Sequence, residues 1–165
     1  MRSEKQIHNI DPFYKADSLI LILGSFPSVR SRESGFFYGH PRNRFWKTAA
    51  FVFGCDVPET IPEKKIFLER NRIALWDVIA SCTVSGSSDS SIKDVTPNDI
   101  SIILNNAPVK AVFTNGATAS KLWSKYQFRD TGRPDIMLPS TSPANAGYSL
   151  EMLQEIWKQK ISEFL

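Results

Sequence analysis

The sequence predicts an α/β fold, a three-layer sandwich in which a central four-stranded parallel sheet has helices on both faces. Short continuous apolar runs are spread along the chain, and such runs are typical of strands buried on both faces. Stretches with helical spacing lie between them, and strands that alternate with helices pair in parallel through right-handed crossovers. At 165 residues, the chain is long enough to bury about two thirds of its unfolded surface as one domain, residues 1–165.

Four segments are predicted to form the strands of this sheet. The first is "SLILIL", residues 18–23, which ends at Gly24. The others are "RIALWDV" at 72–78, "VKAVFT" at 109–114 and "DIML" at 135–138. Each is short and mostly apolar, as an interior strand of a parallel sheet requires.

Five segments are predicted to be helical. Residues 45–53 end at Gly54, residues 62–71 begin with a proline suited to a first turn, and residues 97–106 begin with Pro97 after a capping Thr96. A fourth helix covers 117–126. The last begins near residue 149 and places one apolar stripe toward the core: Leu150, Leu153, Trp157, Ile161 and Phe164.

Composition argues against several classes of protein. The two cysteines, Cys55 and Cys82, form no CxxC pair, which disfavours a disulfide framework or a structural zinc site. No apolar run reaches eighteen residues and no signal-peptide pattern is visible. We therefore expect no membrane partner and a cytoplasmic location, associated with the nucleoid in a prokaryote. We also expect a monomer.

The basic residues are concentrated in one segment. The net charge is only +3, but residues 30–47 hold five cations against one acid, Glu33: Arg30, Arg32, Arg42, Arg44 and Lys47. This excess favours an anionic partner, and a merely solvated basic loop is the alternative interpretation.

Polar or flexible residues follow every predicted strand. Gly24 and Ser25 follow the first, Asp77 lies at the end of the second, Asn115 follows the third, and "PSTSPANA" at 139–146 follows the fourth. Ligands of open parallel sheets bind at this edge. The chain contains neither GxGxxG nor GxxxxGK[ST], so a common nucleotide-binding loop has no support.

The basic segment is also aromatic. Phe36, Phe37 and Tyr38 precede His40 and Asn43, and flat side chains beside cations suit a stacked nucleobase with its phosphates. These rings could instead fill the core, and we expect at least one to do so. Asn43 could cap the helix at 45–53 or orient a water, and the sequence leaves both open. For His40 we expect a structural hydrogen bond.

Several motifs together resemble a known family. "LILGSFPS" followed by "FFYGHPRNRFWK" resembles the uracil-DNA glycosylase superfamily, and "HPRNRFW" is similar to a segment of its mismatch-specific branch. The closer match is the hypoxanthine-DNA glycosylase (DNA-deoxyinosine glycosylase) branch, at "GSFPS", "HPRNRFW", "LWDVIASC", "PND" and "LPSTSPANA". These patches span about residues 19–146.

The resemblance implies a monofunctional repair enzyme for double-stranded DNA. It would hydrolyse the N-glycosidic bond of a flipped-out deaminated base, hypoxanthine first, without a metal or other cofactor. It assigns catalysis to Asn43. Phe26 and Leu138 depart from the family pattern, since several branches have an acidic or amide residue at the first position and histidine or asparagine at the second. Weaker catalysis on uracil is therefore expected.

The resemblance also implies contact residues. The base-binding residues would be Gly24, Ser25, Phe26, Tyr38, Asp77 and Asn115, with Tyr38 and Phe26 as stacking walls. The DNA-binding residues would be Arg42, Arg44, Pro139, Ser140, Thr141, Ser142, Pro143, Ala144 and Asn145, with 143–145 filling the vacated stack.

Asp77 suggests a basis for purine choice. An ionised carboxylate accepts hydrogen bonds and does not donate them, so it would accept from N1–H of hypoxanthine and repel N1 of adenine. The alternative is a structural role for Asp77, as a helix cap or a salt-bridge partner. For Asn115 the alternative is a left-handed turn before Gly116.

Three other functions remain open from the sequence. The chain could be a mismatch-type uracil-DNA glycosylase, a nucleic-acid-binding module without catalysis, or a hydrolase of free nucleotides. The cationic loop and the stretch at 139–146 favour a polymer as substrate.

Overall fold

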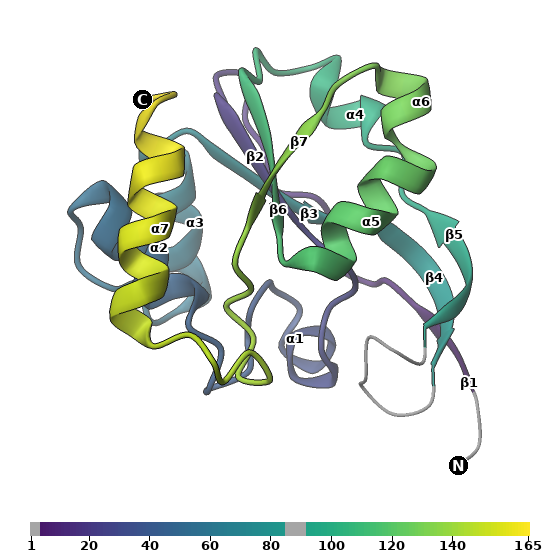
Figure 1. The fold of residues 1–165 in the computed structure, drawn as a ribbon, viewed down its shortest axis with the longest axis horizontal. Helices are drawn as coiled ribbons and strands as arrows, with labels where there is room; N and C mark the ends of the chain where they lie inside the picture. Colours follow the sequence, from purple (N-terminus) through teal and green to yellow (C-terminus); the bar gives the residue numbers. More distant parts are fainter. Residues whose placement is uncertain (1–3, 85–91) are drawn as a thin grey trace.

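The computed structural model describes residues 4–84 and 92–165 and contains the predicted parallel sheet. Its strands are β2 (Ile20–Gly24), β3 (Ile73–Asp77), β6 (Ala111–Asn115) and β7 (Asp135–Leu138). They lie in the order β3-β2-β6-β7, and all three pairings are parallel (Figure 1). The predicted four-stranded sheet is confirmed.

The register brings the four carboxyl ends to one edge of this sheet. Gly24 is paired with Asp77, and Asn115 is paired with Leu138. The two central strands are buried on both faces, and Ile20 to Leu23 are fully inaccessible. That burial explains why these strands are continuous apolar runs in the sequence.

Helices cover both faces, as expected for three layers. In Figure 1, α2 (Phe45–Phe53), α3 (Ile61–Arg70) and α7 (Leu150–Ser162) lie on one side of the parallel sheet. On the other side lie α4 (Ser101–Leu104), α5 (Ala117–Tyr126) and α6 (Phe128–Thr131). The short α1 (Val29–Ser34) follows β2 at the carboxyl edge.

The helix boundaries follow local capping chemistry. Gly54 ends α2 in the left-handed conformation with φ 64°, which glycine adopts without a steric penalty. The side chain of Thr60 accepts a hydrogen bond from the Glu63 backbone, and that of Ser149 accepts one from Met152. The predictions for 45–53, 62–71, 117–126 and the helix near 149 are therefore confirmed to within one residue at the capped ends.

The prediction of a helix over 97–106 is wrong for its first half. Thr96 and Pro97 belong to β5 (Lys93–Pro97), which pairs antiparallel with β4 (Ile79–Val84), and only Ser101–Leu104 is helical. The Asn98 amide explains the difference, because it donates to the Asp77 and Ile79 carbonyls at 2.8 and 3.1 Å and keeps this segment beside β4.

A second, smaller sheet was not predicted. The strand β1 (Glu4–Ile7) pairs antiparallel with β4, so that β1, β4 and β5 form a three-stranded sheet beside the parallel one. In β5, the alternation of exposed and half-buried residues is carried by a mostly polar sequence, which gives little strand signal. This sheet brings the first described residues to the end of β3.

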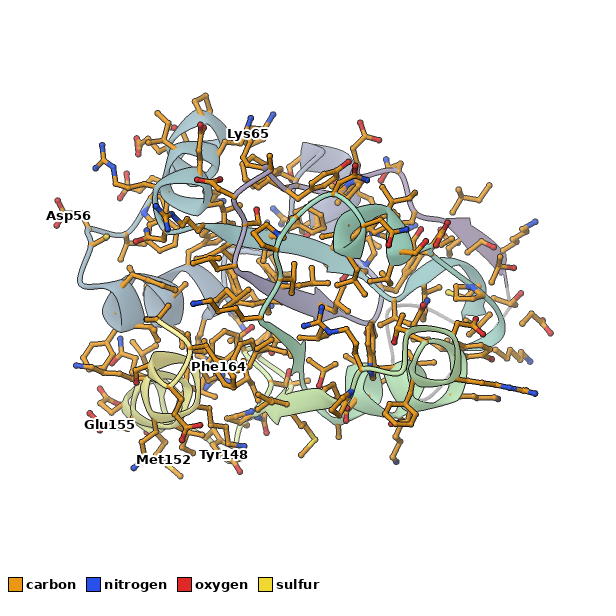
Figure 2. All side chains as sticks on the ribbon, turned by 90° about the horizontal axis from the view of Figure 1, so that it is seen from above. Asp56, Lys65, Tyr148, Met152, Glu155 and Phe164 are labelled. Atoms are coloured by element: carbon orange, nitrogen blue, oxygen red, sulfur yellow. The ribbon has the colours of Figure 1, made fainter. Side chains whose placement is uncertain are left out.

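The apolar stripe of α7 packs as predicted. Leu153, Trp157 and Ile161 are at most 1% exposed, whereas Met152 is 47% exposed. Figure 2 shows Met152 and Glu155 on the outer side of this helix and Phe164 on the side toward the sheet. Among the described residues, no helix is long and apolar enough to cross a membrane.

Shortening a buried residue of α7 will destabilise the fold. We expect Ile161→Ala to lower the free energy of unfolding by about 2–5 kcal/mol, because it removes buried methyl groups and leaves a cavity. Met152→Ala on the same helix is the control and should change it by less than about 0.5 kcal/mol. Urea unfolding of both variants measures the difference, and equal effects would contradict this packing.

Candidate active site

A pocket lies at the carboxyl edge of the parallel sheet. Its volume is about 160 Å³, several times the roughly 30 Å³ that one water occupies. The predicted site residues that line it are Gly24, Ser25, Phe26, Tyr38, Asn43, Asp77, Asn115, Ser140, Thr141 and Ser142. The predicted residues outside this lining are Arg42, Arg44, Pro139, Pro143, Ala144 and Asn145.

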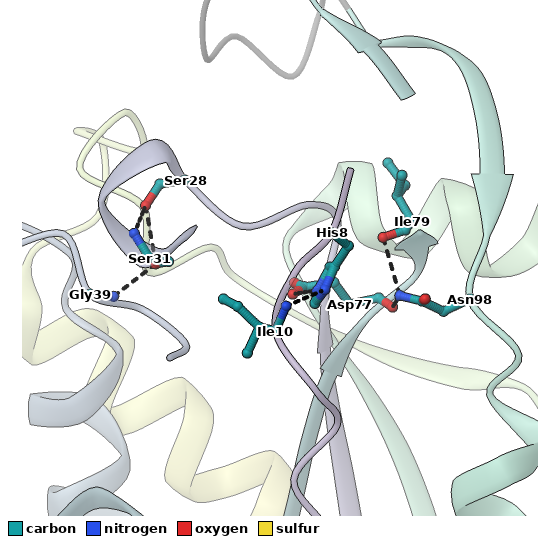
Figure 3. A network of polar contacts seen from close by, with 8 residues as sticks. All are labelled: His8, Ile10, Ser28, Ser31, Gly39, Asp77, Ile79 and Asn98. Atoms are coloured by element: carbon teal, nitrogen blue, oxygen red, sulfur yellow. Dashed lines mark hydrogen bonds and ion pairs between the residues drawn. The ribbon is translucent and has the colours of Figure 1, made fainter. Parts of the chain in front are cut away.

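Asp77 ends β3 at the pocket, and its position is fixed by three neighbours. Asn98 binds its backbone carbonyl, and the following residue, Val78, donates its backbone N–H to the Gly24 carbonyl at 2.9 Å. Its side chain is 5% exposed and accepts a hydrogen bond from His8 (Figure 3). The "PND" motif therefore includes a residue, Asn98, that holds the end of β3 in place.

His8 is a site residue that sequence reasoning missed. Its Nε2 lies 2.8 Å from Asp77 Oδ2, and its own side chain is 3% exposed. Its Nδ1 accepts the backbone N–H of Ile10 at 3.2 Å. The two partners are 69 positions apart in the chain, and no local pattern signals such a contact.

Gly24 allows the Asp77 carboxylate to lie against β2. A Cβ atom at position 24 would lie 2.3 Å from Asp77 Oδ1 and 3.3 Å from the Tyr38 hydroxyl. The first distance is too short for any side chain. Glycine at this position thus permits three groups, the β2 backbone, the carboxylate and the phenol, to meet at one point of the pocket wall.

Tyr38 is held in an unusual conformation. Its φ is 53°, which is rare for a bulky residue and costs free energy. One face of its ring stacks on Phe45, with centroids 4.1 Å apart and planes 14° apart. That face cannot also stack on a base, so the predicted stacking role is limited to the opposite face and stays a prediction. Phe36 and Phe37 fill the core, as expected for part of this aromatic run.

The Tyr38 hydroxyl is buried and has no hydrogen-bond partner among the described residues. Burial raises the pKa of this hydroxyl above its ordinary value, the negative charge of Asp77 raises it further, and the Asn115 side chain opposes the change. The phenol is therefore a donor at any physiological pH. Unpaired buried polar groups are costly and are found preferentially at functional sites.

Thr141 connects the two loops of the pocket. It is fully buried, and its Oγ1 accepts from Asn115 Nδ2 at 2.9 Å and donates to Asn43 Oδ1 at 2.8 Å. Its backbone N–H donates to Asn115 Oδ1 at 3.0 Å. The single hydrogen of the Thr141 hydroxyl is donated to Asn43. In this arrangement the hydroxyl has no hydrogen to donate to a DNA phosphate.

Asn43 lies one residue before Arg44, which is the N-cap of α2, and it lines the pocket. Its Oδ1 accepts the Phe45 backbone N–H at 2.9 Å in addition to the Thr141 hydroxyl. Two donors occupy the two lone pairs of this oxygen. The N-cap interpretation of Asn43 is wrong by one residue, although its oxygen accepts the first helical N–H. Its Nδ2 donates no hydrogen bond among the described residues, and its role in orienting a water stays a prediction.

Arg44 holds the loop at 139–148. Its guanidinium donates to the backbone carbonyls of Ser142 at 2.8 Å and Asn145 at 3.0 Å, and also to that of Tyr148. Asn145 in turn donates from Nδ2 to the Ser140 carbonyl at 3.0 Å. The donors of Arg44 and Asn145 named here are directed at the loop itself, and the DNA contacts expected for these two residues stay predictions.

The remaining predicted DNA contacts are arranged on the outside of the pocket. Arg42, Pro143 and Ala144 are exposed, and Pro139 lies at the base of the loop, where its carbonyl accepts from Trp157 Nε1 at 2.9 Å. His40 Nδ1 accepts the Arg42 backbone N–H at 3.0 Å, so the structural hydrogen bond expected for His40 is present.

Phe26 forms the wall of the pocket nearest to the small sheet. Its ring meets the His8 ring edge-on at 6.0 Å, and the Arg32 guanidinium lies over it at 5.1 Å.

Residues 4–84 and 92–165 contain no group of three or more histidine, cysteine, aspartate or glutamate side chains that could hold a metal ion. The pocket lining offers amides, hydroxyls, one carboxylate, one phenol and the Arg32 guanidinium.

Two curated proteins are similar to most of the chain. The hypoxanthine DNA glycosylase of Methanosarcina acetivorans is 37% identical over 132 residues, which cover 79% of this chain and 82% of that protein. The hypoxanthine DNA glycosylase of Methanosarcina barkeri is 36% identical over 138 residues, which cover 81% and 85%.

A solved structure shares the fold. It is a solution NMR structure of a candidate uracil DNA glycosylase from Methanosarcina acetivorans, with a TM-score of 0.77 and 30% sequence identity, and the match covers 92% of this chain and 96% of that one. The family model of the uracil DNA glycosylase superfamily matches residues 12–161, a range that contains all four parallel strands and both loops joined by Thr141. The chain belongs to the uracil DNA glycosylase superfamily.

Proposed function

We propose that this protein is a monofunctional DNA glycosylase that releases hypoxanthine from a nucleotide flipped out of double-stranded DNA. Membership of the superfamily and the names of the two Methanosarcina relatives support this activity. The single observation that carries the choice of base is the Asp77 carboxylate, buried at the wall of the pocket with one oxygen bound to His8.

The exposed loop tip suits the opening of the duplex. A base inside a duplex cannot be reached at its glycosidic bond, so the nucleotide must rotate outward at a cost of a few kcal/mol. Pro143 and Ala144 are exposed at the tip of a loop that Arg44 fixes from beneath. They would enter the vacated base stack, as apolar wedges of minor-groove binders do. Arg42 and the Ser140 and Ser142 hydroxyls would bind the phosphate backbone of the DNA.

The Asp77 and Tyr38 side chains would read the base as a pair. Hypoxanthine presents an N1–H donor next to a C6 carbonyl acceptor, whereas adenine presents an N1 acceptor next to an amino donor. Asp77 Oδ1 would accept from N1–H, and the unpaired Tyr38 hydroxyl would donate to the carbonyl. Adenine would place acceptor against acceptor and donor against donor. Ser25, Phe26 and Asn115 would complete the wall around the base.

Asn43 would position the water through its nitrogen. Because its Oδ1 already has two donors, Nδ2 would donate to one lone pair of the water, and the other lone pair would attack C1′. The C1′–N9 bond breaks with its electron pair on the base, and hydrogen bonds to the base carbonyl stabilise that charge. The proton that the added water loses passes through solvent to the base anion, so the products are neutral hypoxanthine and the abasic sugar. No strong base is required, since the sugar carries oxocarbenium character when water adds. Such a site works by position and electrostatics.

Uracil is the second candidate substrate. Its N3–H next to the C4 carbonyl presents the same donor and acceptor pair to Asp77 and Tyr38, and the solved structural relative is described as a candidate uracil DNA glycosylase. Release assays on duplexes that contain inosine, deoxyuridine or xanthosine, with alkaline cleavage of the abasic product, rank these bases. Absence of release from every duplex, with DNA binding retained, would instead indicate a non-catalytic binding module.

Two Asn43 variants test how this residue acts. Asn43→Ala should slow hypoxanthine release by about 10²–10³-fold, the usual effect of removing one such donor. Asn43→Asp keeps an oxygen for Phe45 and Thr141 but replaces the donating nitrogen, so it should be slowed to a similar extent. Single-turnover release from an inosine duplex measures both.

Asn106→Ala, which changes a distant exposed asparagine, is the control and should release hypoxanthine at the wild-type rate. An Asn43→Ala enzyme as fast as the wild type would show that the amide is not used.

Replacing the carboxylate of Asp77 should change the base preference. In Asp77→Asn the amide oxygen would accept from His8, and the amide nitrogen would face the base as a donor. We expect hypoxanthine release to fall by about tenfold or more and the ratio of hypoxanthine to adenine release to narrow, because a misplaced donor costs about 1–3 kcal/mol. An unchanged ratio in single-turnover assays would contradict the reading role of Asp77.

Removing the Tyr38 hydroxyl should slow base release without lowering the stability of the fold. Tyr38→Phe deletes a buried group that has no partner in the described structure, so the melting temperature should stay the same or rise. Hypoxanthine release should nevertheless fall by about tenfold, because the donor to the carbonyl is lost. Thermal unfolding and single-turnover kinetics on the same preparation test this, and a variant with wild-type activity would argue against the contact.

A further inference from the structure

The His8 imidazole is enclosed between the pocket and the small sheet. It follows β1, and its backbone N–H donates to the Ala80 carbonyl at 2.7 Å. The rings of Phe26, Phe37 and Trp76 surround it at centroid distances of 6.0, 6.4 and 6.4 Å. With 3% of its side chain exposed, the imidazole is shielded from solvent, and its hydrogen bonds are set by its protein neighbours.

Those neighbours define the tautomer of His8. The Ile10 backbone N–H, 3.2 Å from Nδ1, can only donate, so Nδ1 must carry a lone pair (Figure 3). A neutral imidazole then carries its hydrogen on Nε2. Nε2 is the atom 2.8 Å from Asp77 Oδ2, so His8 donates to the carboxylate and Asp77 accepts.

This hydrogen bond divides the two oxygens of Asp77 between two tasks. Oδ2 is bound to His8, whereas Oδ1 lies beside Gly24 and the Tyr38 hydroxyl on the pocket side. Within residues 4–84 and 92–165, the only lysine or arginine in an ion pair is Arg72, which pairs with Asp17, so no lysine or arginine there neutralises Asp77. The His8 N–H is the side-chain donor that compensates this buried carboxylate.

We propose that His8 is a positioning residue that makes Asp77 an acceptor-only reader of a base edge bearing an N–H group. This inference rests on the proposed function. A buried carboxylate without a donor on Oδ2 loses the contact that fixes its orientation and gains by rotating. Rotation would move Oδ1 from its place beside Gly24 and the Tyr38 hydroxyl, and the acceptor that distinguishes N1–H of hypoxanthine from N1 of adenine would be lost. His8 thus supplies discrimination although it does not touch the base.

Two amide variants of His8 provide a matched test. In His8→Gln the side-chain nitrogen can reach the position of Nε2 and keep donating to Asp77. In His8→Asn the amide ends near the position of Nδ1, where its oxygen can still accept from Ile10 but its nitrogen falls short of the carboxylate. Both variants keep a polar amide of similar character, and they differ in the contact that the proposal requires.

Single-turnover release from duplexes that differ only in hypoxanthine or adenine gives the readout. We expect His8→Gln to keep the wild-type ratio of the two rates within about threefold and His8→Asn to narrow it by about tenfold or more, as loss of a charge-assisted hydrogen bond implies. Equal ratios in both variants and the wild type would overturn the proposal. Equal slowing of both bases by both variants would also overturn it, because it would show a purely structural role.

Nitrogen-15 NMR of the wild-type histidines tests the same contact without a variant or a DNA substrate. We expect His8 to show one protonated Nε2 and one unprotonated Nδ1 at neutral pH, and the reverse pattern would overturn the proposal. If the wild type releases no hypoxanthine while His8 shows the expected tautomer, the proposed function fails and not the contact between His8 and Asp77.

Discussion

The close contact between the ends of β2 and β3 organises the candidate site. Gly24 and Asp77 are register partners in adjacent parallel strands. The Asp77 carboxylate lies so close to Gly24 that a Cβ atom on this glycine would be 2.3 Å from Oδ1. That close approach requires glycine on β2. It also depends on the hydrogen bond from the Asn98 side chain to the Asp77 backbone carbonyl, and on the hydrogen bond from His8 to the buried Asp77 carboxylate. The pocket wall therefore depends on residues from the parallel sheet and from the segments that follow β1 and β5.

The opposite side of the pocket depends on contacts between two loops. Thr141 links Asn115 at the end of β6 to Asn43 before α2, and Arg44 binds three carbonyls of the loop at 139–148. Asn43 Oδ1 accepts from the Phe45 backbone N–H and from the Thr141 hydroxyl, which holds this amide in a frame of hydrogen bonds and leaves its nitrogen without a partner among the described residues. The rigid frame suits a reaction that relies on positioning more than on a strong base.

The architecture could be predicted from the sequence because interior parallel strands leave a plain signal. The runs at 18–23 and 72–78 are mostly apolar because both faces of β2 and β3 are buried. The small sheet left no such signal, because β5 is polar and half exposed. The pocket edge and ten of its lining residues followed from the strand ends and the family resemblance. The contact of His8 with Asp77 could not be predicted, since it joins positions 69 residues apart. The contacts of Arg44 with the loop at 139–148 could not be predicted either, because they are made to backbone carbonyls whose positions depend on how the loop folds.

The central claim is that the Asp77 carboxylate accepts a hydrogen bond from the N–H of the base. The most direct measurement is a double cycle of single-turnover release, in which wild type and Asp77→Ala each act on hypoxanthine and on 1-deazahypoxanthine, where C–H replaces N1–H. Any effect of the analogue on the leaving group is common to both enzymes and cancels. We expect the analogue to be slowed about tenfold more in the wild type than in Asp77→Ala, whereas equal slowing in the two enzymes would show that Asp77 does not contact N1–H.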